Sequence, residues 1–419
     1  MNSPHKTGFA GTPLSGRGTI LQNGGGVVII LYFRRKEPPM KKLYNIFLVL
    51  AIIGTICMRF TYAPEKSPNN LFVDDVVTVG TNIVNKNGEV TEIKGEFDVE
   101  VLYRFTNDKL ALFVDNWRFI GDGVTAFDFH YVNTKGDIVI SDDFDYADQF
   151  SDGLAAAGKD GKYGYIDTNG NVVIEFKFDY TRSFNGSSIA PARIGKQFGY
   201  IDKSGTFVIK PQFDTAYPVV NGIARAADAM MTKSGRYEYT RYIVNEKTRE
   251  VIEVDYDIVD DFGENGLAPV CKFSKWGYIN TKGEEVIKCQ FREAGEFTNG
   301  IAPVIMRDKS CAYIDENGEI VIQFEDFTKL GSFHNGLAWF ADKNDKVGYI
   351  NEKGEIVIEP QFEMYLNVIR EDIFTQERFY AGGNFYDDGY AIVETSNYKQ
   401  GVIDMNGNYV LEPIYDNIG

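Results

Sequence analysis

Residues 275–287 read KWGYINTKGEEVI, and this stretch decides the fold because the chain repeats it. An aromatic run is followed by a four-residue polar break that ends in glycine, and then by a second apolar run. Close copies are KYGYIDTNGNVVI (162–174), QFGYIDKSGTFVI (197–209), SCAYIDENGEIVI (310–322) and KVGYINEKGEIVI (346–358). Weaker copies at 82–93, 129–140, 240–252 and 400–411 bring the number to nine. A fixed period of this size indicates a tandem-repeat architecture.

Two further phrases keep the same register. One contains a short Gly-apolar-Ala run, as in VNGIARAAD (220–228), ENGLAPVCK (264–272), TNGIAPVIM (298–306) and HNGLAWFAD (334–342). The other follows the apolar run, as in KPQFD (210–214), KCQFR (288–292), EPQFE (359–363) and EPIYD (412–416). The residue at the tyrosine position of each copy is number 83, 131, 165, 200, 242, 278, 313, 349 and 402, and the central spacings are 34 to 42 residues. Three phrases in one register exclude coincidence.

Each phrase predicts a β-strand, and the polar breaks such as NTKG, DTNG and DENG predict hairpin turns whose glycine has a positive φ. The unit is therefore a three-stranded antiparallel meander with a shorter fourth element around Phe-Asp. The small residues Ala224, Ala268, Ala302 and Ala338 suit a crowded inner position. A single sheet of this size cannot bury its faces alone and has to stack on its neighbours.

The repeated tyrosines are predicted to form the core between units, and the alternative is an aromatic platform for sugars. They are Tyr165, Tyr200, Tyr278, Tyr313 and Tyr349. The acidic turns resemble a fragment of a calcium loop, but the position of Asn169 is taken by lysine in other copies, so we interpret them as turns. The fold class expected is all-β, with a β-propeller-like closed array favoured and an open β-solenoid as the alternative.

These phrases resemble the WG-repeat family of bacterial proteins, whose units carry Trp-Gly-Tyr-Ile, a polar-Gly turn, a Val/Ile run and Pro-x-Tyr/Phe-Asp. The resemblance covers about residues 76–419. Only Trp276 keeps the tryptophan, while Tyr163, Phe198, Cys311 and Val347 replace it elsewhere, and Ala312, His130 and Arg241 replace the glycine. Units with these replacements are expected to pack less regularly. The resemblance implies an all-β repeat, often exported, with no common activity.

The N-terminal part reads as an export signal. Lys41 and Lys42 precede a charge-free run at 43–58, and a signal-peptidase site follows Ala63, so residues 40–63 are interpreted as a signal peptide or an N-terminal membrane anchor. Residues 1–39 are interpreted as a non-native upstream extension or a disordered segment, with translation starting at Met40, and residues 64–75 as a linker. The repeat domain is then 76–419, with an insertion near 364–386 in which IREDIFTQERF predicts a short helix. Insertions on repeat arrays often form the binding face, so this one is the first place to look for function.

Composition excludes several functional classes. Residues 1–63 hold eight Lys or Arg and one acid, so they carry +7 of a net charge of −17, and the remainder carries −24. A body this acidic repels phosphate backbones, which excludes nucleic acid as a partner. Three histidines, His5, His130 and His334, supply neither a His-rich metal site nor much acid–base chemistry. No catalytic residue, metal or cofactor is expected, and membrane contact is expected only through 43–58 if it stays uncleaved.

Cys271, Cys289 and Cys311 remain after export, and the sequence leaves open whether any two form a disulfide or all three are buried thiols. We expect a non-enzymatic scaffold that binds an unknown protein partner at the cell envelope, in the periplasm or outside the cell. The alternative is a glycan or cell-wall binder that uses exposed Tyr and Phe rings, and a third reading is an enzyme with a site at the mouth of a propeller. The binding residues themselves are unknown from sequence.

Overall fold

The structure is a computed structural model in which the chain divides into two compact units, Met1–Phe60 and Thr61–Gly419. It describes residues 19–22, 28–31 and 70–418, except, within the last range, residues 96, 98, 122–123, 142–143, 234, 236, 365, 370–377 and 382. In the first unit β1 (Thr19–Gln22) and β2 (Val28–Leu31) pair antiparallel. The predicted signal or anchor at 40–63, including its apolar run at 43–58, lies outside the described residues.

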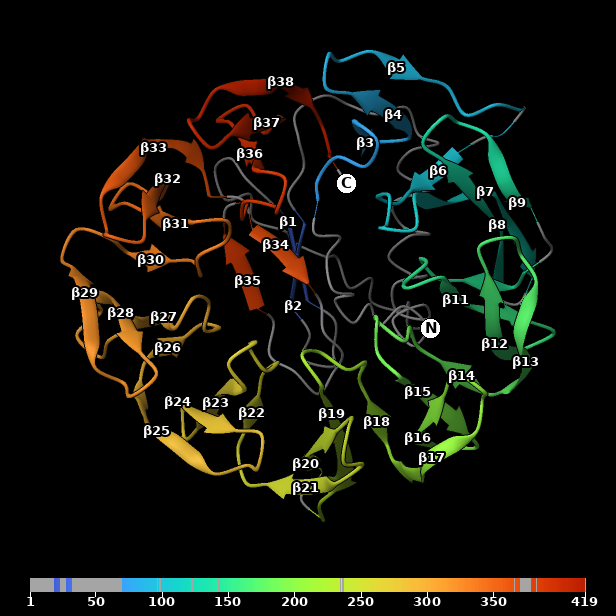
Figure 1. The fold of residues 1–419 in the computed structure, drawn as a ribbon, viewed down its shortest axis with the longest axis horizontal. Helices are drawn as coiled ribbons and strands as arrows, with labels where there is room; N and C mark the ends of the chain where they lie inside the picture. The colour runs from blue at the N-terminus through green and yellow to red at the C-terminus, as the bar shows by residue number, and fades with distance from the viewer. Residues whose placement is uncertain are drawn as a thin grey trace, which may run out of the picture. The chain divides into compact units, whose positions relative to one another are not determined.

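Nine consecutive antiparallel sheets, here called blades 1 to 9, follow one another around a ring in the second unit (Figure 1). Blade 1 comprises β3 (Val76–Val79), β4 (Asn82–Asn85) and β5 (Val90–Thr91). Blade 2 comprises β6 (Val99–Leu102), β7 (Leu110–Gly121), β8 (Val124–Asn133) and β9 (Ile138–Ser141). Blade 3 comprises β10 (Tyr146–Ala147), β11 (Leu154–Lys159), β12 (Lys162–Asp167) and β13 (Val172–Phe178).

The middle of the ring repeats this arrangement. Blade 4 comprises β14 (Tyr180–Thr181), β15 (Ile189–Ile194), β16 (Gln197–Asp202) and β17 (Phe207–Phe213). Blade 5 comprises β18 (Thr215–Ala216), β19 (Ile223–Met231), β20 (Tyr237–Asn245) and β21 (Val251–Val254). Blade 6 comprises β22 (Ile258–Val259), β23 (Leu267–Lys272), β24 (Lys275–Asn280) and β25 (Glu285–Phe291).

The last three blades complete the ring. Blade 7 comprises β26 (Glu293–Ala294), β27 (Ile301–Ile305), β28 (Cys311–Asp315) and β29 (Ile320–Phe324). Blade 8 comprises β30 (Lys329–Leu330), β31 (Leu337–Ala341), β32 (Lys346–Asn351) and β33 (Ile356–Glu363). Blade 9 comprises β36 (Tyr390–Glu394), β37 (Gln400–Asp404) and β38 (Tyr409–Tyr415), and it is joined to blade 8 by the single pair Glu363↔Glu394. The described residues contain no helix, and the predicted all-β fold of three- and four-stranded meanders is confirmed.

The last strand of each four-stranded blade lies on the rim of the ring (Figure 1). From blade 3 to blade 8 the two-residue strand that opens the blade is the opposite, inner edge of the sheet. This short strand is the fourth element predicted around Phe-Asp. It pairs with the strand that follows it, as Thr215 and Ala216 pair with Ala227 and Ala226, so it belongs to the next blade and not to the unit that precedes it. Each sequence unit therefore contributes strands to two blades, which links neighbouring blades through the chain itself.

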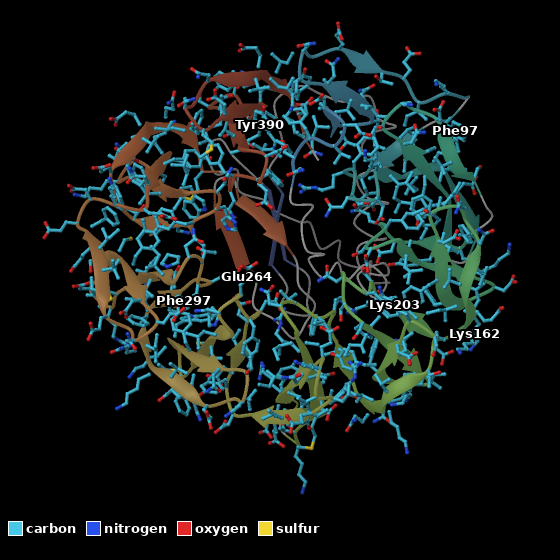
Figure 2. All side chains as sticks on the ribbon, viewed as in Figure 1. Phe97, Lys162, Lys203, Glu264, Phe297 and Tyr390 are labelled. Atoms are coloured by element: carbon cyan, nitrogen blue, oxygen red, sulfur yellow. The ribbon has the colours of Figure 1, made fainter. Side chains whose placement is uncertain are left out.

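The same offset closes the ring. The residues after β38 are in the position of an innermost strand, and Ile418 forms an antiparallel bridge with Val79 of blade 1 while Gly80 donates its N–H to the Asn417 carbonyl at 3.0 Å. The Ile418 side chain is buried in one cluster with residues from both blade 1 and blade 9. At this joint the ring of Tyr390, which is labelled in Figure 2, meets the Phe72 ring edge to face with centroids 5.2 Å apart. The C-terminus thus supplies the missing strand of blade 1, and the array is closed and not an open solenoid.

The repeated tyrosines join six of the nine blades to the next, while blades 1, 5 and 9 have Ile83, Ile243 and Val402 at this position. All five that were predicted to be core residues are fully buried, so that prediction is confirmed. The Tyr278 hydroxyl donates a hydrogen bond to the Gly295 carbonyl on the innermost edge of blade 7 at 2.9 Å, and the Tyr278 ring packs on Phe297 with centroids 4.8 Å apart. The same donor and acceptor positions recur as Tyr131 to Asp148, Tyr165 to Arg182, Tyr200 to Tyr217, Tyr313 to Gly331 and Tyr349 to Gly383.

The polar breaks are the predicted turns. In KWGYINTKGEEVI the Asn280 Oδ1 atom accepts the backbone N–H groups of Lys282 and Glu284, and Gly283 has φ +77°. Asp167 uses its Oδ1 atom in the same way, accepting the backbone N–H groups of Asn169 and Asn171, which is ordinary turn chemistry. The first glycine of the motif has a different reason, since a Cβ on Gly277 would lie 2.5 Å from the Ile287 carbonyl oxygen.

The close approach at Gly277 goes with a bulge in the rim strand, because Trp276 pairs with Phe291 while Tyr278 pairs with Ile287. Where a larger residue replaces the glycine, this bulge is absent. In blade 7, Cys311, Ala312 and Tyr313 pair with consecutive residues of β29. The expected irregularity of such units is therefore real, and its cause is the added side chain.

Two details of the fifth repeat were aligned wrongly in the sequence analysis. The turn begins at Asn245, so the buried residue two positions earlier, Ile243, takes the tyrosine position that we gave to Tyr242. Tyr242 then takes the glycine position and Arg241 takes the tryptophan position. The pattern TRYIV misled the alignment because it contains a tyrosine one residue out of register.

The insertion near 364–386 contains β34 (Leu366–Ile369) and β35 (Arg378–Ala381), which pair antiparallel. Ile369, Arg378 and Phe379 lie at the ends of the predicted helix but are in these strands, so the helix is wrong at both ends. Residues 370–377 lie outside the described residues. The β-branched run around Val368 favours a strand over a helix.

We predict that Ile418→Ala destabilises the protein by about 2–4 kcal/mol, because it removes a buried side chain from the joint that closes the ring. Ile414→Ala is the matched control, since Ile414 lies four residues away and is 64% exposed. Its effect is expected to stay within about 0.5 kcal/mol. The measurement is urea unfolding of both variants, and equal effects would show that Ile418 closes nothing.

Candidate interaction surface

The hairpins between the second and third strands of the four-stranded blades all point to one end of the ring, because the blades share one topology. The turns such as NTKG and DENG lie at the opposite end. At that opposite end, residues of the turns contact the preceding blade: Lys203 forms an ion pair with Asp152 at 2.7 Å, and Glu316 accepts a hydrogen bond from Asn265 at 3.0 Å. That end is therefore occupied by contacts between blades, and the hairpin tips are the freer end.

Blade 5 has the longest of the hairpins in blades 3 to 8. Strands β19 and β20 each have nine residues, against six in the corresponding strands of blades 4 and 6. Neither β18 nor β21 pairs with the added residues, which therefore project beyond the blade. The sequence signal is the spacing of 42 between Tyr200 and Tyr242 of the opening phrase, or 43 with Ile243 in the tyrosine position, which is the longest of the central intervals.

The two faces of this hairpin follow from its register. Ala226 and Tyr242 pack toward blade 4, while Ile223 and Ile243 pack toward blade 6. Because pairs alternate faces along a strand, Met231 and its partner Tyr237 lie on the blade 6 side. Above the blade itself these residues have no neighbouring blade to cover them.

A group of apolar side chains on three adjacent tips is exposed, and we call it the tip patch. Its members are Ile194 of blade 4, Met230, Met231 and Tyr237 of blade 5, and Phe273 of blade 6. Their exposed fractions range from 48% for Ile194 to 80% for Phe273. Other exposed apolar residues, such as Val173, Val286 and Val321, are spread over the rim strands of different blades. Isolated residues of that kind are normal, whereas a concentration on one face indicates an interaction site.

A continuous series of rings and cations connects the long hairpin with the tip of blade 6. The Tyr237 and Tyr239 rings are stacked with centroids 6.2 Å apart, and the Arg241 guanidinium lies 5.4 Å from the Tyr239 centroid. Arg241 also donates to the carbonyl of Tyr256 at 3.1 Å. The Lys272 ammonium lies 5.8 Å from the rings of both Tyr256 and Phe273. On the blade 6 side of the long hairpin, Tyr237 of the tip patch is therefore connected to Phe273 by ordered contacts, whereas Met230 lies on the blade 4 side.

The turn at the tip of blade 6 has residue types that are unusual for its backbone conformation. Phe273 and Ser274 have φ values of +50° and +58°, a region that bulky side chains rarely adopt. The equivalent turn of blade 3 uses Asp160 and Gly161, which tolerate such values. A strained turn that holds a phenylalanine in solvent stabilises nothing inside the blade, and strain of this kind is often found at functional positions.

The inner edge of blades 5 to 7 carries a second group of polar residues. Arg225 is buried at a position where blades 4, 6 and 7 have proline, and its Nε atom lies 2.8 Å from Asp261 Oδ1 of blade 6. Burial, together with the nearby carboxylates of Asp261 and Glu264, raises the pKa of Glu296 to about 7. Figure 2 shows Glu264 on the inner side of blade 6. The Arg225–Asp261 ion pair links blades 5 and 6, and Glu296 adds one weakly acidic carboxyl nearby.

His130 forms a chain with two other side chains in blade 2. Its Nε2 atom lies 2.8 Å from Asp115 Oδ1, and its Nδ1 atom lies 2.9 Å from Ser141 Oγ. The ring is buried and stacks on Phe113 with centroids 4.9 Å apart. Relative to a catalytic triad the two ring nitrogens are exchanged, because there Nδ1 faces the carboxylate. We interpret the contacts as satisfying a polar ring that occupies the repeat's glycine position.

The cysteines and the remaining candidate sites carry no assembled chemistry. Cys271, Cys289 and Cys311 are free thiols, and burial raises the pKa values of Cys289 and Cys311 to about 11. Within the described part of the chain no three His, Cys, Asp or Glu residues are grouped so as to hold a metal ion. In that same part, none of the segments is a helix long and apolar enough to span a bilayer.

Sequence reasoning placed the special surface at the insertion, whereas the tip patch lies on blades 4 to 6. The insertion itself lies largely outside the described residues. Met230 and Met231 were missed because a repeat comparison emphasises what the copies share. The long interval before position 242 and the departure of ADAMMTKSGRYEY (227–239) from every other copy were the available signals.

The family model described as WG containing repeat matches residues 131–163, 163–197, 198–227, 243–275, 276–309, 312–346, 348–374 and 401–419. These eight segments span more than half of the chain. No curated protein matches it.

Several solved structures resemble the fold. A crystal structure of the eukaryotic initiation factor is 10% identical, covers 82% of this chain and 96% of its own, and has a TM-score of 0.53. BamB from Moraxella catarrhalis is 9% identical, with coverage of 64% and 94% and a TM-score of 0.33. Dipeptidyl peptidase 4 from Porphyromonas gingivalis is 10% identical, with coverage of 83% and 58% and a TM-score of 0.42. At these identities the first likeness extends to the fold alone, and the lower TM-scores of the other two add nothing to it.

We predict that Glu296→Gln stabilises the protein at pH 8 and leaves it unchanged at pH 4. The folded pKa of about 7 lies above the value of about 4.3 for an unfolded glutamate, so the folded state binds more protons between these values. The free energy of unfolding of the wild-type protein therefore falls as pH rises from 4 through 7. Glutamine does not ionise and avoids this fall, so at pH 8 the variant is expected to be more stable by on the order of 1–3 kcal/mol. Urea unfolding at both pH values measures it, with the exposed Glu293→Gln as control. A gain at pH 4, or none at pH 8, contradicts the assignment.

Proposed function

The chain belongs to the family of proteins built from the WG containing repeat, and from this premise we propose that it is a non-enzymatic scaffold that binds a protein partner through the tip patch. The observation that carries the proposal is the concentration of exposed apolar side chains on the tips of blades 4 to 6. Aromatic and methionine side chains are the residue types enriched at the centres of protein interfaces. Because the patch stands on paired strands, its residues are ordered before a partner arrives, which lowers the entropic cost of binding.

The alternative readings have less support. A glycan platform needs rings that lie open on successive blades, but the repeated tyrosines are fully buried between blades. An enzyme at the inner edge needs a nucleophile, a base and a stabilising donor at one point. At the inner edge of blades 5 to 7, Arg225 and Asp261 are engaged in an ion pair, and Glu296 is a single weakly acidic carboxyl. A protein contact is the function that uses the exposed patch.

We further propose that the protein acts at the cell envelope or outside the cell. The support is the sequence of residues 40–63, with two lysines, an apolar run at 43–58 and a small residue at position 63. The many acidic side chains of the repeat domain then face an aqueous compartment. The membrane is a partner only through 43–58 where that segment stays uncleaved.

We predict that the photo-crosslinking residue p-benzoylphenylalanine forms a discrete adduct with a partner protein in cells when it replaces Tyr237 or Phe273. Replacement of Tyr409 is the matched control, because Tyr409 is also an exposed aromatic residue but lies on the rim strand of blade 9. Met231→Lys is expected to remove the adduct at position 273 while leaving the fold intact, since it places a charge in the patch. Equal adducts from position 409, or none from positions 237 and 273, would contradict the proposal.

The same cells test the location. The adduct is expected in the envelope or secreted fraction. An adduct confined to the cytosol would contradict the proposed export while leaving the protein contact standing.

A further inference from the structure

A cleft of about 560 Å³ lies at the hairpin-tip end of the ring where blade 7 meets blade 8. This volume falls in the range of about 300–1,000 Å³ that is typical of small-molecule sites. The cleft is separate from the tip patch, which ends at Phe273 of blade 6. Nothing in the proposed scaffold function requires a hollow at this place.

The hollow follows from the irregular seventh unit. With Ala312 in the glycine position, β29 pairs without the bulge and ends at Phe324. In regular blades the residue at the end of the bulged rim strand is a buried phenylalanine, such as Phe291, but Phe324 is only half-buried. Residues 325–328 then cross to blade 8 as a loop, with one residue more than usual between Tyr313 and its hydrogen-bond acceptor. The loop borders a space that regular blades fill.

One wall of the cleft is apolar and ordered. Phe327 lies in a stack of three rings, with centroids 4.4 Å from Phe324 and 4.0 Å from Phe340. Phe327 and Ile305 line the cleft, and the neighbouring Cys311 Sγ atom donates to the Phe327 carbonyl at 3.4 Å. Because Phe324 and Phe340 cover the two faces of the Phe327 ring, the cleft meets the edge of this ring beside Ile305. An aromatic group packs favourably edge to face against such a wall.

The remaining wall is charged, with a small excess of cations. Arg292, Lys309, Lys329 and Lys343 line the cleft together with Glu293, Asp308 and Glu325. Several of these charges are already used: Asp308 accepts from the N–H and hydroxyl of Ser310, Lys343 pairs with Asp326 at 2.5 Å, and Arg292 lies 3.9 Å from Glu293.

Among the described residues the structure gives no ion pair to Lys309 or Lys329, which leaves two ammonium groups for a ligand. The repeat domain at 76–419 carries −22, so a lining with one more cation than carboxylates is a local site of opposite sign. An excess of cations in a concave site favours an anion there.

We propose that this cleft binds a small organic anion, whose carboxylate or phosphate is held by Lys309 and Lys329 and whose aromatic body packs against the edge of Phe327 and against Ile305. The ammonium groups supply charge without a fixed orientation, so the site discriminates by charge and flatness and not by bidentate geometry. Binding is expected to weaken as salt rises, because the lysines are near the surface.

Isothermal titration of the full-length protein with 1-naphthyl phosphate tests the proposal, with the neutral 1-naphthol as a second titrant. We expect saturable binding of the phosphate with one site per chain and at least tenfold weaker binding of the naphthol. The double substitution Lys309→Glu with Lys329→Glu is expected to weaken binding of the phosphate at least tenfold. Lys282→Glu with Lys353→Glu changes the net charge equally, at exposed turn positions on the opposite end of the ring, and is expected to leave binding unchanged.

Phe273→Lys distinguishes binding in the cleft from binding on the tip patch. Naphthyl phosphate bound to the patch would be lost in this variant, whereas naphthyl phosphate bound in the cleft is retained. The proposal is overturned if 1-naphthyl phosphate shows no saturable binding up to millimolar concentration. So does equal weakening by the two lysine pairs, equal affinity for naphthol, or loss of binding in Phe273→Lys. Because the cleft and the patch use different residues, failure of either proposal leaves the other standing.

Discussion

The buried tyrosine hydroxyl that reaches the next blade is the contact on which the ring depends. In blades 2 to 4 and 6 to 8 the tyrosine hydroxyl donates a hydrogen bond to a carbonyl on the inner edge of the following blade. The aromatic ring of the tyrosine packs between the two sheets. A buried hydrogen bond of this kind contributes about 1 kcal/mol net, but an unpaired hydroxyl or carbonyl in the same place costs more. The contact therefore fixes the distance and angle between neighbouring blades. Its acceptor is 17 or 18 residues away in regular units and 34 residues away across the insertion, so the joint survives an added segment.

The positions where the repeat departs from this plan are the ones that carry function in our account. Blade 5 has Ile243 in the tyrosine position and a large residue in the glycine position, and its hairpin is the long one that presents Met231 and Tyr237. Blade 7 has Ala312 in the glycine position, and a cleft results. In both units the lost bulge changes how the rim strand pairs, and the chain is then routed differently outside the shared core. The repeat supplies a rigid ring, and individual departures supply surfaces.

Much of the fold could be predicted from the sequence, because repetition reports the same local physics nine times. The turn at Asn280 and Gly283, the buried ring of Tyr278 and the three main strands of a unit follow from residue types and spacing. The transfer of the short strand to the next blade could not be predicted, since sequence units and sheets need not share boundaries. Ring closure by Ile418 depends on the number of blades and the angle between them, which no single phrase encodes. The tip patch depends on three different tips meeting on one face, and that is a property of the assembled ring.

Hydrogen–deuterium exchange of the full-length protein tests the closed ring most directly. In an open array the terminal sheets have one unsupported face and exchange faster than the middle. In the closed ring the Gly80 amide, which donates to Asn417, and the Ile418 amide, which donates to Gln400 Oε1 at 2.7 Å, lie inside a joint like those between other blades. We expect both amides to be protected to within about tenfold of the blade 4 and blade 6 amides. Exchange of these two amides at rates near those of an unstructured chain, with the middle blades still protected, would contradict the closed ring.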